Sequence, residues 1–185
     1  AIAERAIERV ASIVNDVSAL ACDPDLAGVV ARHGAAVILM HTRGRSADMY
    51  AHATYADVIG EVATELGARV RAAGAAGIDR DRIVVDPGLG FAKTADQSWQ
   101  ALAGLGRLHA LGLPVLSGPS RKSFLKAALG DVPPDDRIWG TAAAVTASVL
   151  AGAHIVRVHD VRAMVDVVRC ADQLLASGAG FGPES

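Results

Sequence analysis

The sequence predicts an α/β fold built on a parallel β-sheet. Short runs of β-branched and aliphatic residues recur along the chain, and each is followed by a turn and a helix-like segment. The apolar residues within each run are nearly continuous, which is typical of parallel strands covered on both faces. A doubly wound sheet and a (β/α)₈ barrel both satisfy this pattern, and periodicity alone does not choose between them.

The expected strands are short, and each ends close to a polar residue. In chain order they are SIVND (residues 12–16), AVILMH (36–41), RIVVDPG (82–88), PVLSG (114–118) and HIVRVHD (154–160). The clearest helix is expected over residues 57–73, because its acidic side chains come early, its arginines come late, and Gly74 and Gly77 follow. About five βα units are therefore expected.

Length and composition exclude several classes of protein. The chain has 185 residues, of which 51% are hydrophobic and 21% charged, with a net charge of −2. This predicts one domain over residues 1–185, with a flexible tail over 177–185. Without a basic excess or a long apolar run, no nucleic-acid or membrane partner is expected. Cys22 and Cys170 lie far apart, which fits a reducing, cytoplasmic compartment.

The stretch PVLSGPSRKSFLKAALG contains an electrostatic anomaly. A helix is expected directly after the Gly-Pro-Ser turn, with Ser120 as its N-cap and Arg121 and Lys122 as its first residues. A helix N-terminus already carries roughly half a positive charge, so cations are unfavourable there. An anionic ligand beside Arg121 and Lys122 would relieve the conflict.

Other polar residues follow the remaining strands, at the edge where parallel α/β sheets bind ligands. Asn15 ends the first run and Asp86 the third, while Arg157 and His159 end the fifth. Arg157 and His159 are two residues apart, so they share one face of their strand, and Val156 and Val158 face the helices. Asp16 and Asp160 have the opposite parity and are expected to be structural.

Each of these residues also has an ordinary structural interpretation. Asp86 precedes Pro-Gly and could simply form a turn, Asn15 could cap one, and His159 could be a hydrogen-bonded core histidine. For His41 and Arg43, which follow the second run, a solvated loop is the better interpretation. Together, however, the strand-end residues form a set that suits an acidic ligand with a donor-rich, neutral part.

The loop DPGLGFAKT supports a ligand site after the third strand. Pro87 ends the strand, because it has no N–H for the ladder. Gly88 and Gly90 allow a close approach of backbone to ligand, and Phe91 offers an apolar wall. The glycine spacing fits neither a Walker motif nor the Rossmann fingerprint. A metal hydrolase is disfavoured, because no His-x-His pair ends a strand.

Taken together and in order, IVNDVSAL, VILMHTRG, IVVDPGLGFAKT, LSGPSRKSF and IVRVHDV resemble the dihydropteroate synthase family over nearly the whole chain. The resemblance implies a (β/α)₈ barrel, a homodimer and magnesium as cofactor. It also implies the joining of 6-hydroxymethyl-7,8-dihydropterin diphosphate to p-aminobenzoate, with release of diphosphate, and competition by sulfonamides at the p-aminobenzoate pocket.

The resemblance also implies a role for individual residues. The pterin would be held by Asn15, Met40, Asp86, Gly90 and Lys122, the diphosphate by Arg157 and His159, and p-aminobenzoate by Phe91, Ser120 and Arg121. Lys122, Arg157 and His159 would act in catalysis by stabilising the departing negative charge. No protein nucleophile is required.

The family's opening strands, which carry its magnesium-linked Asn, have no counterpart in these 185 residues. The sequence therefore predicts the last part of a barrel, with two open strand edges, no metal ligand in this chain and weak or absent activity on its own. Two alternatives stay open. They are a methyltetrahydrofolate-binding methyltransferase domain, which needs no diphosphate site, and a non-catalytic pterin-binding fragment.

Overall fold

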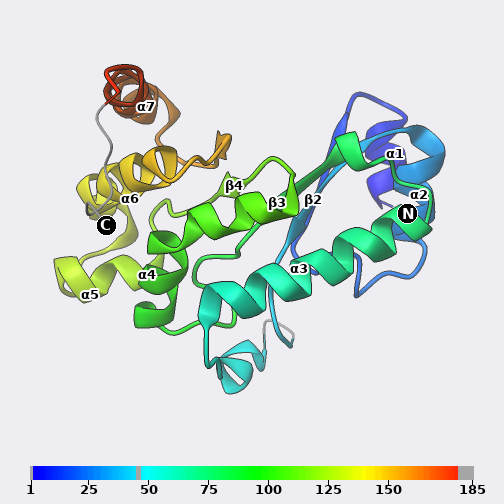
Figure 1. The fold of residues 1–185 in the computed structure, drawn as a ribbon, viewed down its shortest axis with the longest axis horizontal. Coiled ribbons are helices and arrows are strands. Elements are labelled where there is room, and N and C mark those ends of the chain that lie inside the picture. Colours follow the sequence, from blue (N-terminus) through cyan, green and yellow to red (C-terminus); the bar gives the residue numbers. More distant parts are fainter. Residues whose placement is uncertain (1, 45–46, 179–185) are drawn as a thin grey trace.

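The computed structural model describes residues 2–44 and 47–178. The predicted α/β class is confirmed, and each predicted strand is found (Figure 1). The strands are β1 (Ile13–Asp16), β2 (Ala36–Met40), β3 (Ile83–Asp86), β4 (Leu116–Ser117) and β5 (Ile155–Val156). The α-helices are α1 (Ile2–Ile7), α2 (Leu26–His33), α3 (Val58–Ala75), α4 (Ala95–Ala103), α5 (Lys126–Leu129), α6 (Ile138–Leu150) and α7 (Val161–Ala176). Short 3₁₀ helices cover Met49–His52, Arg80–Arg82, Leu105–Leu111, Ser123–Leu125 and Pro134–Arg137.

The strands are parallel and lie side by side in chain order. β1, β2 and β3 form one ladder, β4 and β5 form another, and the pairing of Val85 with Val115 joins the two. This order never reverses within the described residues, whereas a doubly wound sheet reverses its strand order at a switch point. Helices α1 and α2 lie at one end of the array and α6 and α7 at the other (Figure 1).

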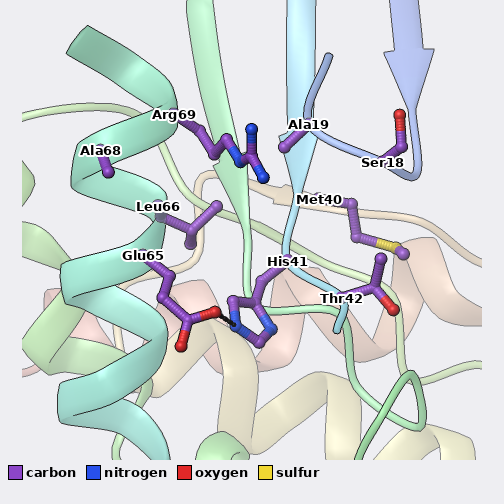
Figure 2. Close-up of a pocket in the computed structure, with 9 residues that line it drawn as sticks. All are labelled: Ser18, Ala19, Met40, His41, Thr42, Glu65, Leu66, Ala68 and Arg69. Atoms are coloured by element: carbon purple, nitrogen blue, oxygen red, sulfur yellow. Dashed lines mark hydrogen bonds and ion pairs between the residues drawn. The ribbon is translucent and has the colours of Figure 1, made fainter. Parts of the chain in front are cut away.

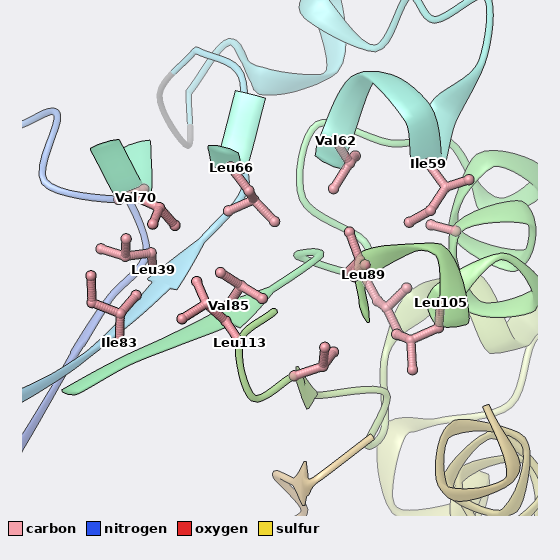
Figure 3. Close-up of a cluster of buried hydrophobic side chains, with 14 of the residues drawn as sticks. Leu39, Ile59, Val62, Leu66, Val70, Ile83, Val85, Leu89, Leu105 and Leu113 are labelled. Carbon is pink, nitrogen blue, oxygen red and sulfur yellow. The ribbon is translucent and has the colours of Figure 1, made fainter. Parts of the chain in front are cut away.

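Strand register places two sets of side chains on opposite faces of the sheet. Val14 is paired with Val37, and Val37 with Ile83, so these side chains share the face that α3 covers. This face holds the main core, which includes Leu39, Leu66 and Val85 (Figure 3). Asn15, Met40 and Asp86 have the opposite parity, so the register directs them to the other face.

The predicted helix over residues 57–73 is α3, two residues longer at its end. Asp57 is its N-cap, and the Asp57 side chain accepts a hydrogen bond from the Gly60 N–H at 3.2 Å. Helix α4 begins with a capping box, in which Thr94 and Gln97 exchange side-chain and backbone hydrogen bonds. These caps fix where the two helices start, and therefore how the preceding loops are held.

The helix expected to begin with Arg121 and Lys122 starts later, and that prediction is wrong. Arg121 has a left-handed backbone with φ of 58°, and Lys122 is extended with φ of −66° and ψ of 150°. The 3₁₀ helix Ser123–Leu125 and then α5 follow. The two cations therefore belong to a loop, and Ser120 is not an N-cap.

A second, smaller apolar cluster lies between α6 and α7. Its buried members are Val145, Val149, Met164 and Ala171, and Val156 and Val158 of the β5 segment pack against it, as their parity predicts. The predicted tail falls mostly on residues 179–185, which lie outside the described residues. No helix in the described part of the chain is long and apolar enough to cross a membrane.

We expect Leu39→Ala to lower the free energy of unfolding by about 2–5 kcal/mol, since Leu39 is fully buried in β2 and truncation leaves a cavity. Urea unfolding followed by circular dichroism measures the change. Leu175→Ala on α7 is the matched control, because Leu175 is 44% exposed, and it should cost less than about 1 kcal/mol. Equal losses for the two variants would contradict the proposed location of the core.

Candidate functional site

The carboxyl ends of the parallel strands bring most of the predicted site residues to one side of the sheet. Met40 of β2 is paired in register with Asp86 of β3, and Asn15 of β1 lies one strand further along on the same face. Asn15 is exposed, whereas Met40 and Asp86 are buried. Arg157 and His159 follow β5 and are exposed.

Asp86 has a buried carboxylate, and one hydrogen bond fixes its side chain while another fixes its backbone. Its Oδ1 accepts a hydrogen bond from the Gly88 N–H at 2.7 Å, and its carbonyl oxygen accepts one from the His41 N–H at 2.9 Å. Burial raises the pKa of Asp86 to about 6, and the Gly88 hydrogen bond and the charges of Lys122, Lys93 and Arg157 oppose that rise. Three cations therefore act on one carboxyl group.

The loop after β3 has a conformation that requires glycine. Gly88 has φ of 66°, and a Cβ atom there would lie 2.0 Å from the His41 carbonyl oxygen. Gly90 has φ of 76°, and a Cβ atom there would lie 3.7 Å from Cδ of Lys122. Both glycines have the positive φ that the sequence predicts, and Gly88 lets the loop lie directly against the His41 backbone.

Lys122 extends from the loop after β4 to this place. Its ammonium lies 3.9 Å from the centroid of the Phe91 ring, and burial lowers its pKa, while Asp86 partly offsets that effect and Arg157 adds to it. Lys122 and Arg157 each act on Asp86 and on one another, so they belong to one electrostatic site.

Arg121 differs from Lys122 in having its charge compensated inside the protein. The Arg121 guanidinium donates two hydrogen bonds to Asp160, at 3.0 and 2.6 Å, and a further one to Asp135. Its backbone N–H donates to Thr141 Oγ1 at 3.0 Å, and its carbonyl accepts from Arg137 at 2.8 Å. The expected conflict between Arg121 and a helix dipole does not exist, and Asp160 is structural, as its parity predicts.

Ser120 and His159 form a second fixed pair. Ser120 is buried, and its Oγ accepts from the His159 backbone N–H at 3.1 Å and lies 2.9 Å from His159 Nδ1. The hydroxyl of Ser120 thus holds the imidazole ring across the gap between the β4 and β5 loops. Nε2 of His159 is the ring nitrogen that this contact leaves available.

The expectation of a solvated loop at His41 is wrong. His41 is 3% exposed, and its Nε2 lies 3.0 Å from Glu65 of α3 (Figure 2). Glu65 is also bound by Arg43, whose guanidinium stacks 3.9 Å over the Tyr55 ring. Lys93, which is 2% exposed, lies 3.0 Å from Nδ1 of His41. Sequence reasoning missed Lys93, although a lysine inside the glycine loop DPGLGFAKT was a visible signal.

A small pocket on the α3 side of this network opens next to His41 (Figure 2). It has a volume of about 200 Å³ and is lined by Ser18, Ala19, Met40, His41, Thr42, Glu65, Leu66, Ala68 and Arg69. Asp86, Lys122 and Arg157 do not line the pocket, but Met40, which is paired with Asp86, does, so the pocket borders the strand-end site.

Both the sequence and the structure of this chain are similar to those of known proteins. Residues 1–159 match the family described as pterin binding enzyme. Dihydropteroate synthase from Synechocystis is 43% identical over 173 residues, which cover 94% of this chain and 60% of that relative. The Thermus thermophilus dihydropteroate synthase structure in complex with 4-aminobenzoate is 38% identical with a TM-score of 0.88, and the match covers 94% of this chain and 70% of that one. The structure of the Thermus protein in complex with 6HMPPP matches with the same TM-score and identity, covering 94% and 68%.

We expect Gly88→Ala to destabilise the protein by about 2 kcal/mol or more, because the added methyl group meets the His41 carbonyl and the left-handed backbone is strained. Gly74→Ala in the last turn of α3 is the matched control. A Cβ atom there meets nothing within 4 Å, so helix propensity should give a gain of about 0.5–1 kcal/mol. Thermal and urea unfolding of both variants measure the difference, and a neutral Gly88→Ala would contradict the loop geometry.

Proposed function

The chain belongs to the pterin binding enzyme family, and from that premise we propose that it is the pterin-binding part of a dihydropteroate synthase. The chain spans 60% of the length of the Synechocystis relative. Such an enzyme joins 6-hydroxymethyl-7,8-dihydropterin diphosphate to p-aminobenzoate. The observation that carries the proposal is the buried carboxylate of Asp86, with Lys122 and Arg157 close enough to act on it.

Asp86 suits the pterin because a carboxylate accepts hydrogen bonds from a planar edge that carries an N–H and an NH₂ group. Asn15, at the end of the outer strand, can exchange hydrogen bonds with the same ring, and buried Met40 provides an apolar surface beside Asp86. Gly90, whose φ of 76° favours glycine, holds the loop in contact with Lys122 beside the proposed pterin site. The complex of the Thermus relative with 6HMPPP supports a pterin ligand for this family member.

The diphosphate and p-aminobenzoate sites follow from the two loops after β4 and β5. Arg157 and His159 are exposed after β5 and can bind an anion. Phe91 and Lys122 would border p-aminobenzoate, and the Thermus complex with 4-aminobenzoate supports that substrate. Because the side chains of Ser120 and Arg121 are bound internally, we propose that they contribute by fixing His159 and Lys122 rather than by direct contact.

The mechanism that these side chains support is dissociative. The bond between the pterin methylene carbon and the diphosphate oxygen breaks, and its electron pair leaves with the diphosphate. Lys122, Arg157 and His159 stabilise that developing charge, while ionised Asp86 stabilises the electron-deficient pterin. The amine of p-aminobenzoate then forms the new C–N bond and releases a proton to solvent.

Magnesium, which the resemblance implies, remains a proposal. Among residues 2–44 and 47–178, no group of three or more His, Cys, Asp or Glu side chains is placed to hold a metal ion. These residues therefore do not fit the ion by themselves, and no step of the mechanism runs through it.

We also propose that the sheet is an arc of a (β/α)₈ barrel. The strands follow chain order, and both outer strands expose apolar side chains, with Ile13 51% and Ile155 39% exposed. An apolar groove of about 470 Å³ flanks β5 and includes Val156, Val161, Val165 and Val168. Further βα units packed against these edges would bury this surface.

The homodimer and the cytoplasmic location that the sequence predicts are kept as proposals. The free, exposed thiols of Cys22 and Cys170 are compatible with a reducing compartment. Sedimentation of the purified protein tests the dimer directly.

Turnover is the decisive test of function. Release of diphosphate and formation of dihydropteroate should be measured for this chain alone and for the chain fused to the amino-terminal segment of the Synechocystis relative. We expect activity that is weak for the chain alone and restored in the fusion. Pterin binding without turnover in both forms would favour a non-catalytic binder, and methyl transfer to a corrinoid would favour a methyltransferase domain.

We expect pterin binding to weaken as the pH falls below about 6. The pKa of Asp86 is raised to about 6, and only the carboxylate form, present above that pH, accepts from the pterin N–H groups. Affinity measured by calorimetry should therefore fall by up to about tenfold per pH unit below 6.

Asp86→Asn should reduce pterin affinity by about tenfold to a hundredfold and remove this pH dependence, because the amide does not titrate. Asp131→Asn is the control, since Asp131 pairs with Lys126 on the surface. If binding by the unmodified protein is the same at pH 5 and pH 7, Asp86 does not hold the ligand.

A further inference from the structure

Lys93 is a buried lysine whose hydrogen-bonding capacity is fully used. It is 2% exposed, and its ammonium has three N–H donors. Its Nζ lies 3.0 Å from Nδ1 of His41, 3.2 Å from the Gly88 carbonyl and 3.1 Å from the Phe91 carbonyl. Burying an ammonium is costly unless it is fully bonded, so its presence between two loops points to a role in holding them.

These contacts close a ring around Asp86. The His41 N–H donates to the Asp86 carbonyl at 2.9 Å, and the Gly88 N–H donates to Asp86 Oδ1 at 2.7 Å. Lys93 then joins the Gly88 carbonyl to the His41 ring. The end of β2 and the loop after β3 are thus locked together at Gly88, the residue whose N–H binds the Asp86 carboxylate.

On the side away from Asp86, helix α3 holds this ring of hydrogen bonds through Glu65. Nε2 of His41 lies 3.0 Å from Glu65 Oε2, and Arg43 donates to Glu65 Oε1 at 3.0 Å. With Lys93 donating to Nδ1, the proton of a neutral His41 lies on Nε2 and is donated to Glu65. Burial lowers the pKa of His41 to about 4, so the ring is neutral near pH 7 and can accept from Lys93.

We propose that Lys93 is a positioning residue for the pterin-binding carboxylate, locking the loop from Gly88 to Phe91 so that Asp86 and the Phe91 ring are presented to the substrates. This inference rests on the proposed function, because it concerns the site at which the pterin would bind. Lys93 acts through the backbone of Gly88 and Phe91 and through His41, and it is not assigned a contact with substrate.

Lys93 also affects the charge of Asp86. The charged groups that act on Asp86 are Lys122 from the β4 loop, Arg157 after β5 and Lys93 itself. Lys93 is influenced in turn by Asp86, Arg43, Glu65 and Lys122, and burial lowers its pKa to about 7. Removing the charge of Lys93 should therefore raise the pKa of Asp86 further, since one compensating cation is lost.

The test is the pH dependence of pterin diphosphate binding by Lys93→Met in the full natural polypeptide that contains these residues. Methionine fills similar volume without charge or donors. We expect Lys93→Met to bind pterin diphosphate about tenfold more weakly than the unmodified protein at pH 6. The midpoint of its pH dependence should lie at a higher pH. Lys126→Met is the control, because Lys126 is a surface lysine paired with Asp131, and it should leave affinity and midpoint unchanged.

A second pair of variants keeps the inference testable if Lys93→Met does not fold. His41→Asn keeps an oxygen acceptor near the place of Nδ1, whereas His41→Leu offers none. We expect His41→Asn to retain more pterin affinity than His41→Leu, and equal affinities would overturn the proposal. So would a folded Lys93→Met with unmodified affinity and midpoint.

The same measurements separate this inference from the proposed function. If the unmodified polypeptide does not bind pterin diphosphate, the proposed function fails. If it binds normally and Lys93→Met binds equally well at every pH, only the role of Lys93 fails.

Discussion

A buried carboxylate at the end of β3 is the constraint on which the rest of the site depends. Burial of Asp86 raises its pKa, and the ionised form is tolerated because a backbone N–H and three cations compensate it. The need to compensate this carboxylate accounts for Gly88, whose conformation no other residue adopts without strain. It also accounts for Lys93, which binds the Gly88 carbonyl and so holds the loop in place. A ligand whose edge is rich in N–H donors would add further hydrogen bonds to the Asp86 carboxylate.

Arg121 and Lys122 are neighbours in the sequence, but their side chains have different partners. The partners of Arg121 give it a structural role, whereas Lys122 points toward the candidate site. Arg121 is bound by Asp160 and Asp135, and its backbone is held by Thr141 and Arg137. Lys122, the next residue, extends over the Phe91 ring toward Asp86. The left-handed turn at Arg121 directs the two side chains apart. Lys122 is thus the cation that the proposed function assigns to an anionic ligand, while Arg121 ties the loop after β5 to the loop after β4 through Asp160.

Much of the fold could be predicted because its signals are local. The β-branched runs that become β2 and β3, and the polarity of charges along α3, are properties of a few adjacent residues. Strand parity correctly placed Val156 and Val158 toward the helices and Asp160 in a structural role. The helix start at Arg121 was mispredicted, because a left-handed residue held by distant partners breaks the pattern that Ser120 suggests.

By itself the sequence determined the order of the strands along the chain, the glycine loop after β3 and the polar residues at the strand ends. Only the tertiary structure decided which of those polar groups are compensated internally and which remain available to a ligand. His41 and Lys93 are 52 residues apart, and Ser120 and His159 are 39 apart. Hydrogen bonds over such separations depend on how strands pair and loops pack, and no local spacing in the sequence encodes them.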